Sequence, residues 1–299
     1  MNSLATALVD SWSALSQTPR IRVTDLTSGK EASLFRHRTF EEFDLVSPEM
    51  NELKTPDDAT VRVLVYKPRD LEPGRKYPVV IYAYGMPGVP TIQDAWPGNR
   101  GLFHQFLVQQ GFVVALVDDR SSSIPGHVHA VTAYKKIGSL AARDHATAVQ
   151  YIDGLPFADG NRSAIWGWSG GGFTASYHMT HTDLFKAAIA GAPVTDWRLY
   201  DSIYTERYMG LPQNDPEVYE DSSSVLAAAS CRGRLLLIYG TQDDNVHPQN
   251  TIQLANALIR NKKQFDLMMY PDKTHGISGT AENVHLYTLM YDFITRTLR

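Results

Sequence analysis

Cysteine is nearly absent from the chain. Cys231 is the only one among 299 residues, which excludes any internal disulfide. Its position just ahead of an apolar run is typical of a buried structural thiol rather than of a nucleophile. No group of cysteines and histidines has the spacing of a zinc site. We therefore expect neither a metal site nor an organic cofactor.

Basic patches and long apolar runs are missing as well. The formal net charge is -4 and the 28 Lys and Arg residues are scattered, so nucleic acid is not an expected partner. Apolar runs such as Phe112–Val117 and Leu235–Tyr239 fall well short of the roughly 20 residues that span a bilayer. The sequence therefore predicts no membrane anchor.

The N-terminus lacks the features of an export signal. Met1–Leu15 carries Asp10 but no Lys or Arg, whereas a secretory signal begins with basic residues and continues with a long apolar core. We expect the protein as written not to be exported by itself, and its compartment stays open.

The chain is rich in hydrophobic residues, at 43%, which is enough for one large α/β domain or two smaller ones. Residues 1–35 alternate polar and apolar side chains and turn at Thr27–Lys30, which predicts a short β segment. A second β stretch is predicted at Phe40–Val46. The strict alternation of Thr60–Tyr66 then indicates a half-buried antiparallel strand at a sheet edge.

Beyond this strand the pattern changes to continuous apolar runs separated by helical lengths, which is typical of parallel strands covered on both faces. The runs are Val79–Tyr84, Phe112–Val117, Ala164–Gly167, Ala187–Ala190, Leu235–Gly240 and Phe265–Tyr270. Helices are predicted at Leu140–Ile152, Pro248–Arg260 and Ala281–Leu298. The expected fold is α/β, a mostly parallel twisted sheet with helices on both faces.

One short motif points to a catalytic serine. The hexapeptide Gly167–Gly172 follows an apolar run and places Ser169 between glycines. A strained strand-to-helix turn lifts a serine Oγ out of the sheet, and flanking glycines let the backbones pass closely. The spacing predicts a nucleophile elbow with Ser169 as the nucleophile. Because such a pentapeptide arises easily by chance, the rest of the site has to support it.

A serine nucleophile needs a base held in the right tautomer by an acid. In α/β-hydrolases these follow in the order serine, acid, histidine, each in a loop after a strand. His275 is the only histidine in the loop after Phe265–Tyr270, and we expect it to be the base. The loop after Leu235–Gly240 offers Asp243 and Asp244, between which periodicity cannot choose.

The tetrahedral intermediate also needs donors for its oxyanion. The backbone N–H of Gly170 is one expected donor. The loop that usually supplies the other begins Tyr84-Gly85-Met86 and has no HGGG-type run. A tyrosine hydroxyl serves instead in one interpretation; in the other, Tyr82 and Tyr84 are both strand aromatics that pack on neighbours.

The sequence segments around these loops resemble those of a known family. The relevant segments are Gly167-Trp168-Ser169, Ala192-Pro193-Val194-Thr195-Asp196-Trp197, Asp201 to Gly210 (DSIYTERYMG), Gly240 to His247 (GTQDDNVH) and His275-Gly276-Ile277. From about Tyr77 to the C-terminus the chain resembles the catalytic domain of the prolyl oligopeptidase family of serine peptidases, in its dipeptidyl peptidase IV branch. The resemblance implies an α/β-hydrolase fold plus a short N-terminal β segment.

The resemblance also implies residue roles. The acid is Asp243, with Ser169 as nucleophile, His275 as base and Tyr84 as the second oxyanion donor. Asn245 contacts the substrate backbone. A pocket for a proline side chain is formed by Val194, Trp197, Tyr200, Tyr204 and Val246. Because Trp197, Tyr200 and Tyr204 are spaced three and four apart, we expect them to share one helical face; a buried core stripe is the alternative.

Departures from the family pattern bear on specificity and domain organisation. The family places an aromatic residue after the nucleophile, whereas this chain has Gly170, so one pocket wall is missing and looser specificity is expected. Ser121-Ser122-Ser123 stands where the family usually has glycine. Family members carry a β-propeller ahead of the hydrolase domain, for which 299 residues leave no room.

Residues 1–35 resemble the closing strands of such a propeller, and residues 36–299 are the expected catalytic domain. The sequence then represents a truncated product, an excised domain or a lone hydrolase. The leading hypothesis is a serine peptidase that cleaves after proline or a small residue. An esterase with the same triad and a vestigial non-catalytic module are the alternatives. Expected partners are a peptide or small ester substrate, and the resemblance adds a homodimer.

Overall fold

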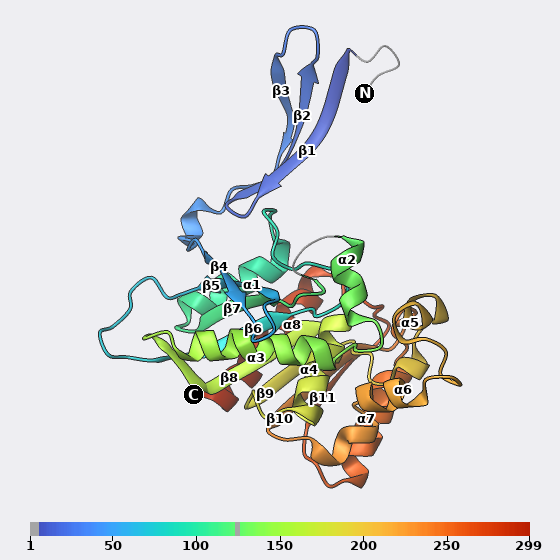
Figure 1. The fold of residues 1–299 in the computed structure, drawn as a ribbon. Helices are drawn as coiled ribbons and strands as arrows, with labels where there is room; N and C mark the ends of the chain where they lie inside the picture. Colours follow the sequence, from blue (N-terminus) through green and yellow to red (C-terminus); the bar gives the residue numbers. More distant parts are fainter. Residues whose placement is uncertain (1–5, 123–125) are drawn as a thin grey trace. The chain divides into compact units, whose positions relative to one another are not determined.

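The structure is a computed structural model that describes residues 6–122 and 126–299. The chain divides into two compact units (Figure 1). The first comprises Met1–Ser47 with Gln93–Phe106, and the second comprises Pro48–Ile92 with Leu107–Arg299.

The first unit contains an antiparallel sheet of β1 (Ala7–Ala14), β2 (Gln17–Asp25) and β3 (Glu31–Arg36), in that order. Arg22 on the middle strand pairs with Asp10 of β1 at 2.7 Å and with Glu31 of β3 at 3.3 Å. The turn before β3 is shaped by Asp25, whose Oδ1 accepts the N–H groups of Thr27 and Ser28. This arrangement agrees with the short β segment predicted from the alternation of polar and apolar residues.

The predicted β stretch at Phe40–Val46 is wrong. A single 3-10 turn, η1 (Glu41–Phe43), stands there, followed by irregular chain. The backbone N–H and C=O of Val46 both bond the Gln105 side chain, at 2.9 and 2.8 Å, and the Phe40 ring stacks on Trp96 at 5.4 Å. Because a side chain already satisfies the backbone of Val46, no partner strand is needed there.

The second unit is built on an eight-stranded sheet in the order β11-β10-β9-β8-β6-β7-β5-β4 (Figure 1). Strand β5 runs antiparallel to both of its neighbours, β4 and β7, as the alternation of Thr60–Tyr66 predicted. The predicted place at the sheet edge is wrong, because β4 pairs with the outer side of β5 and most of β5 is buried. The strands are β4 (Glu49–Lys54), β5 (Thr60–Tyr66), β6 (Tyr77–Ala83), β7 (Val113–Asp118), β8 (Ala158–Trp168), β9 (Ala187–Gly191), β10 (Arg234–Gly240) and β11 (Asp266–Tyr270).

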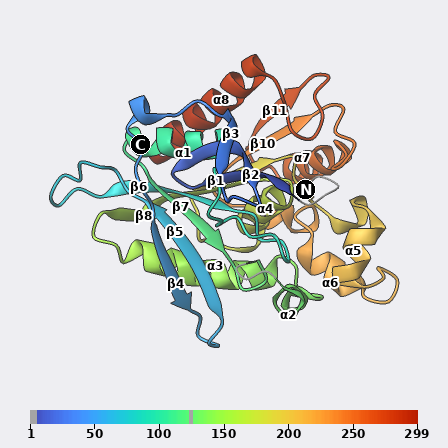
Figure 2. The same cartoon turned by 90° about the horizontal axis from the view of Figure 1, so that it is seen from above.

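Helices cover both faces of this sheet (Figure 2). The longer ones are α3 (Ser139–Asp153), α4 (Gly170–His181), α7 (Gln249–Arg260) and α8 (Thr280–Leu298). Helix α1 (Gly98–Gln109) belongs mostly to the first unit. Shorter ones are α2 (His127–Ala130), η2 (Val131–Ala133), η3 (Trp197–Leu199), α5 (Ser202–Met209), α6 (Pro216–Ser222) and η4 (Leu226–Ser230). Helices α3, α4 and α7 pack on one face, and α8 contacts β8 and β9 from the other.

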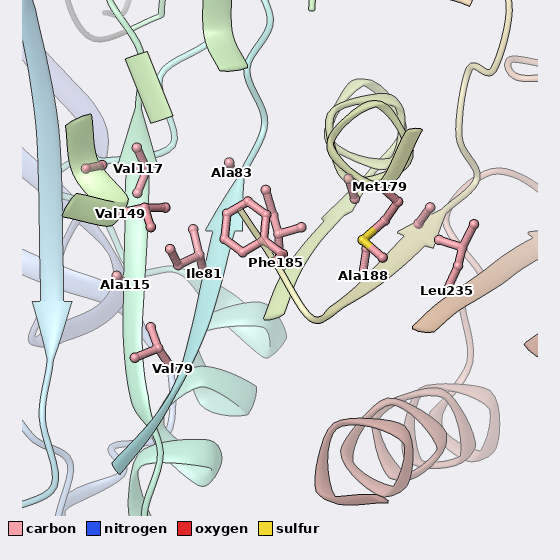
Figure 3. Close-up of a cluster of buried hydrophobic side chains, with 14 of the residues drawn as sticks. Val79, Ile81, Ala83, Ala115, Val117, Val149, Met179, Phe185, Ala188 and Leu235 are labelled. Carbon is pink, nitrogen blue, oxygen red and sulfur yellow. The ribbon is translucent and has the colours of Figure 1, made fainter. Parts of the chain in front are cut away.

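The main core lies between the sheet and helices α3, α4 and α7 (Figure 3). Alternate residues of each central strand point into it, among them Val79 and Ile81 of β6 and Leu235 of β10, and Met179 of α4 meets them. Every residue of α4 from Gly170 to Thr180 is buried. The helix that follows Ser169 is therefore fixed in the centre of the unit.

Candidate active site

Ser169 stands between β8 and α4 in a strained conformation. Its φ and ψ are 60° and -119°, a region that costs a non-glycine residue on the order of 1–3 kcal/mol. Its N–H donates to the Gly191 carbonyl at 2.8 Å, and its own carbonyl accepts from Phe173 N at 2.9 Å. These bonds hold the turn in the sharp form that the sequence motif predicted.

The glycines beside Ser169 are required by close backbone approach. A Cβ on Gly167 would lie 2.4 Å from the Gly171 oxygen, and a Cβ on Gly171 would lie 2.7 Å from the Ala83 oxygen. Real Cβ atoms do not come this close to backbone oxygens. The crossing of β8, α4 and β6 at this point therefore accepts only hydrogen as a side chain.

His275 and Asp243 form a direct pair. His275 lies after β11 and Asp243 after β10, and His275 Nδ1 is 2.8 Å from Asp243 Oδ2. The Asp243 side chain is fully buried, while that of His275 is 23% exposed. Asp243 Oδ1 accepts the N–H groups of Asn245 and Val246 at 3.0 and 2.9 Å. The neighbouring Asp244 is exposed, so the structure places one carboxylate of the two against the imidazole.

Trp168 links the histidine loop to the elbow. Its indole Nε1 donates to the backbone carbonyl of His275 at 2.7 Å, and it directly precedes Ser169. Between the described side chains of Ser169 and His275 themselves no hydrogen bond is formed. Nucleophile–base hydrogen bonds are often longer before substrate binds, so the backbone link is the structural relationship that brings the two loops together.

Tyr84 lies beside Gly170. Its Cε1 is 3.2 Å from the position that a Cβ on Gly170 would take, and its carbonyl accepts from Thr174 Oγ1 of α4 at 2.8 Å. Tyr82, by contrast, is buried in β6 with its ring 4.6 Å from that of Trp166. Of the two tyrosines that the residue pattern could not separate, Tyr82 therefore lies within the sheet, and Tyr84, the one that the resemblance favoured, lies beside the residue after Ser169.

The loop that carries Tyr84 is held by Asp118, a residue that the sequence reasoning missed. Its buried carboxylate accepts from Thr91 N, Thr91 Oγ1 and Ile92 N at 2.6–3.0 Å. Burial raises the pKa of Asp118 despite these bonds. Gly88 N adds a bond to the Ser121 carbonyl at 2.9 Å. A strand-end aspartate was the only available signal, and it is common in α/β sheets.

Three aromatic rings gather next to this loop. The Trp197 ring lies 5.9 Å from those of Tyr200 and Tyr204, which are 5.8 Å from each other. The prediction that these three residues share one helical face is wrong, because Trp197 belongs to η3 and Tyr204 to α5. The chain is interrupted between them by Asp201, whose side chain caps α5 by accepting Tyr204 N. The rings meet through tertiary folding instead.

The remaining predicted pocket residues join the same cluster. Val194 and Val246 are each 2% exposed and pack with Trp197 and the buried Met86. Asn245 is exposed, and its Oδ1 accepts from the Tyr200 hydroxyl at 3.0 Å. The structure thus brings together all six residues that the resemblance assigned to substrate binding, and it adds Met86.

Two polar atoms of the cluster have no hydrogen-bond partner. They are Trp197 Nε1 and the Tyr204 hydroxyl, both shielded from solvent. Burial raises the pKa of Tyr204 strongly. Buried polar atoms are normally paired, so two buried donors without a partner are unusual. Both lie in the cluster against which Tyr84 packs.

Backbone strain is found at two further buried positions around the site. Exposed or half-buried non-glycine residues elsewhere in the described chain also have positive φ, but Ala192 and Ile277, with φ values of 41° and 42°, are buried beside the site. They follow β9 and His275 respectively. Such conformations, rare for a β-branched residue, are commonly found at functional sites.

Neither a metal cluster nor a membrane helix is seen in the described parts. Within residues 6–122 and 126–299, no three His, Cys, Asp or Glu side chains are placed to hold a metal ion. In the same residues no helix is both long enough and apolar enough to cross a bilayer.

A strained serine between a strand and a helix, with an aspartate–histidine pair in the loops after two further parallel strands, defines the class as the α/β-hydrolase fold. Comparison with known proteins gives the family. The sequence profile of the prolyl oligopeptidase family matches residues 102–299, and the chain belongs to that family.

Individual relatives agree with this assignment. The chain is 39% identical over 254 residues to human prolyl endopeptidase FAP, covering 84% of this chain and 33% of that protein. It is 36% identical over 255 residues to mouse dipeptidyl peptidase 8, covering 83% and 29%. The chain therefore spans about a third of the length of the curated relatives it matches.

Solved structures match nearly the whole chain. The crystal structure of Porphyromonas gingivalis dipeptidyl peptidase 4 superposes with a TM-score of 0.90 at 33% identity, covering 98% of this chain and 42% of that one. A putative dipeptidyl aminopeptidase IV from Bacteroides ovatus gives a TM-score of 0.90 at 29% identity, covering 100% and 43%. The predicted α/β-hydrolase fold and family resemblance are confirmed.

Proposed function

We propose that this chain is a serine hydrolase that cleaves peptide bonds, preferentially after proline or a small residue, through an acyl-enzyme. Family membership supports the reaction class. The observation that carries the residue assignment is the Asp243–His275 hydrogen bond, in a loop that Trp168 ties to the elbow. All the proposed catalytic residues belong to the second unit.

In this proposal Ser169 Oγ attacks the scissile carbonyl while His275 Nε2 takes its proton. His275 Nδ1–H donates to Asp243, which keeps the imidazole in the correct tautomer and stabilises its protonated form. The imidazolium then gives its proton to the leaving amine as the C–N bond breaks. Water attacks the resulting ester with His275 again as base, and this releases the acid and restores Ser169.

The oxyanion would be held by the N–H of Gly170 and the hydroxyl of Tyr84. Gly170 opens α4, so its N–H has no helical acceptor and the helix dipole favours a negative charge there. The Tyr84 ring already lies against Gly170. Each such donor typically contributes a factor of about 10²–10³ in turnover.

The acyl-side pocket would be lined by the aromatic cluster. Flat rings from Trp197, Tyr200 and Tyr204, with Val194 and Val246 beneath them, suit a rigid apolar ring such as that of proline. The Tyr200 hydroxyl donates a hydrogen bond to Asn245 Oδ1. The Asn245 amide N–H₂ therefore stays available to donate to a substrate carbonyl. This gives the substrate backbone one fixed contact.

Residues 36–299 are our proposed catalytic domain, with residues 1–35 as a separate β segment. The same triad would also serve an esterase, so substrate choice has to be measured. We suggest comparing a Gly-Pro p-nitroanilide with p-nitrophenyl butanoate, using Ser169→Ala as the blank. Anilide turnover that Ser169→Ala abolishes supports the peptidase. Fast ester hydrolysis with no anilide hydrolysis would reject it in favour of an esterase.

A further inference from the structure

The space beside the proposed nucleophile is filled from a different loop. A Cβ on Gly170 would lie 2.3 Å from Met86 Cγ and 3.1 Å from Met86 Sδ. Met86 follows Tyr84 by two residues and is 2% exposed. Its thioether therefore lies directly against the backbone of the residue after Ser169, where residue 170 has no side chain of its own.

Met86 belongs to the cluster that forms the proposed pocket. It packs with the buried residues Val194, Trp197 and Val246, and Tyr84, Tyr200 and Tyr204 border the same cluster. It does not contribute to the main core between the sheet and its helices. Its side chain is thus placed among acyl-side residues rather than among residues that only hold the sheet together.

The backbone of Met86 is fixed. Its carbonyl accepts from Val89 N at 3.2 Å, and the next turn is held by the bond from Gly88 N to the Ser121 carbonyl. Asp118 secures the end of the loop through Thr91 and Ile92. A rigid backbone that carries a long, unbranched side chain gives a wall whose position is set but whose shape can adapt.

We propose that Met86 is a specificity-determining residue, which supplies the acyl-pocket wall that Gly170 cannot provide. This inference rests on the proposed function and extends its substrate class. A methionine side chain can change rotamer where a rigid ring cannot. The pocket should therefore accept unbranched acyl side chains of increasing length in addition to proline.

Removal of the thioether should change which substrates are preferred rather than activity in general. In Met86→Ala we expect kcat/KM for short acyl groups to fall relative to long ones. One methylene in an apolar pocket is worth roughly 10–200-fold in discrimination, so the long-to-short ratio should rise at least about 10-fold. The readout is a series of p-nitrophenyl esters from acetate to octanoate, measured together with Gly-Pro and Gly-Ala anilides.

Met179→Ala is the matched control. Met179 is also 2% exposed, but it lies in the main core. The substitution Met179→Ala should lower the free energy of unfolding about as much as Met86→Ala does, and it should leave the long-to-short ratio of kcat/KM unchanged. If Met86→Ala does not yield folded protein, Met86→Val, which also shortens the side chain, is measured against the same criterion.

A second pair of variants tests the contact itself. Gly170→Ala should disturb Met86 and alter the acyl preference, and adding Met86→Ala should recover more activity than the sum of the single effects predicts. If the effects of Gly170→Ala and Met86→Ala on kcat/KM were strictly additive, the proposed contact between the two residues would be contradicted.

The ester series keeps the outcome separate from the proposed peptidase activity, because it reports acyl preference whether or not anilides are cleaved. A shift in the long-to-short ratio in the Met86 variant alone supports the inference. An unchanged ratio, or an equal change in Met179→Ala, overturns it. Absence of anilide hydrolysis with a shifted ester ratio would reject the peptidase function and retain the role of Met86.

Discussion

The indole Nε1 of Trp168 donates to the backbone carbonyl of His275 across 107 residues of sequence, at 2.7 Å. This bond joins the residue before the proposed nucleophile to the residue proposed as its base. The loop after β11 is otherwise attached to the loop after β10, through bonds such as Gln242 N to the Lys273 carbonyl at 2.9 Å. Trp168 is therefore what aligns the Asp243–His275 pair with the elbow.

Removal of this donor should lower activity more than stability. In Trp168→Phe the ring packing is largely kept, but the His275 carbonyl loses its partner, at a net cost of about 0.5–1.5 kcal/mol. Misplacement of the base by about 1 Å can cost roughly 10²-fold. We expect kcat to fall 10- to 100-fold with little change in KM, measured by steady-state kinetics beside thermal unfolding. Trp12→Phe, in the first unit, is the control; an equal loss there would refute the alignment role.

The two adjacent aspartates should behave very differently. Asp243→Asn keeps an oxygen for Asn245 N and Val246 N but presents an amide N–H₂ to His275, which favours the wrong tautomer. We expect kcat to fall about 10³- to 10⁴-fold. Asp244→Asn removes the same charge from an exposed neighbour and should leave kcat within about twofold. Comparable losses in both variants would remove Asp243 from its proposed role.

The elbow should tolerate no side chain at Gly171. A Cβ there would lie 2.7 Å from the Ala83 oxygen, a backbone atom of β6 that cannot move without disturbing the sheet. We expect Gly171→Ala to unfold at clearly lower denaturant concentration, by about 1–3 kcal/mol of overpacking. Gly276→Ala is the matched control, because a Cβ at Gly276 has no atom within 4 Å. Similar urea midpoints for the two would contradict the packing argument.

A buried pair of histidines couples stability to pH. His145 Nδ1 lies 2.9 Å from His178 Nε2, joining α3 to α4. The Thr182 hydroxyl donates to the His178 carbonyl, so it accepts from His178 Nδ1. This fixes His178 Nε2 as an acceptor and His145 Nδ1 as the donor. The His178 ring is then neutral in the folded protein.

Burial lowers the pKa of both histidines, that of His178 well below its ordinary value of 6.5. The unfolded chain therefore binds more protons than the folded one below pH 6.5, and the free energy of unfolding should fall as pH decreases through that window. The slope is at most about 1.4 kcal/mol per pH unit for each proton. Urea titrations between pH 7 and 5 should show this slope, reduced in the double variant His145→Leu, His178→Leu.

The exposed His247 provides the control for this prediction. His247→Gln should keep the wild-type dependence of unfolding free energy on pH. A double variant that retains the full slope would show that other groups are responsible, such as the buried His104, whose pKa is lowered to about 3, chiefly by burial.

Sequence patterns predicted the sheet well because its order follows local rules. The apolar runs at Val79–Tyr84 and Leu235–Gly240 match β6 (Tyr77–Ala83) and β10 (Arg234–Gly240), since buried parallel strands need continuous apolar side chains. The predicted strand Phe40–Val46 failed where the backbone of Val46 is satisfied by the Gln105 side chain. No local pattern encodes a partner 59 residues away.

The site shows the same division. The loops of the proposed serine, acid and histidine were predictable because each follows a strand, whereas the choice of Asp243 over Asp244 came only from the family resemblance. The residue pattern could not separate Tyr82 from Tyr84; the family resemblance favoured Tyr84, and in the structure Tyr82 lies against Trp166 while Tyr84 lies beside Gly170. The missing pocket wall at Gly170 was evident from the sequence, but a loop methionine carries no signal that its side chain lies against that glycine.

The most direct test of the account is active-site labelling followed by peptide mapping. A fluorophosphonate reacts only with a serine whose proton is removed by a positioned base. We expect one adduct per chain, on the peptide containing Ser169, with a labelling rate that falls at least about 10³-fold in His275→Gln. A label elsewhere, or an undiminished rate in that variant, would contradict the proposal that Ser169 and His275 work as one unit.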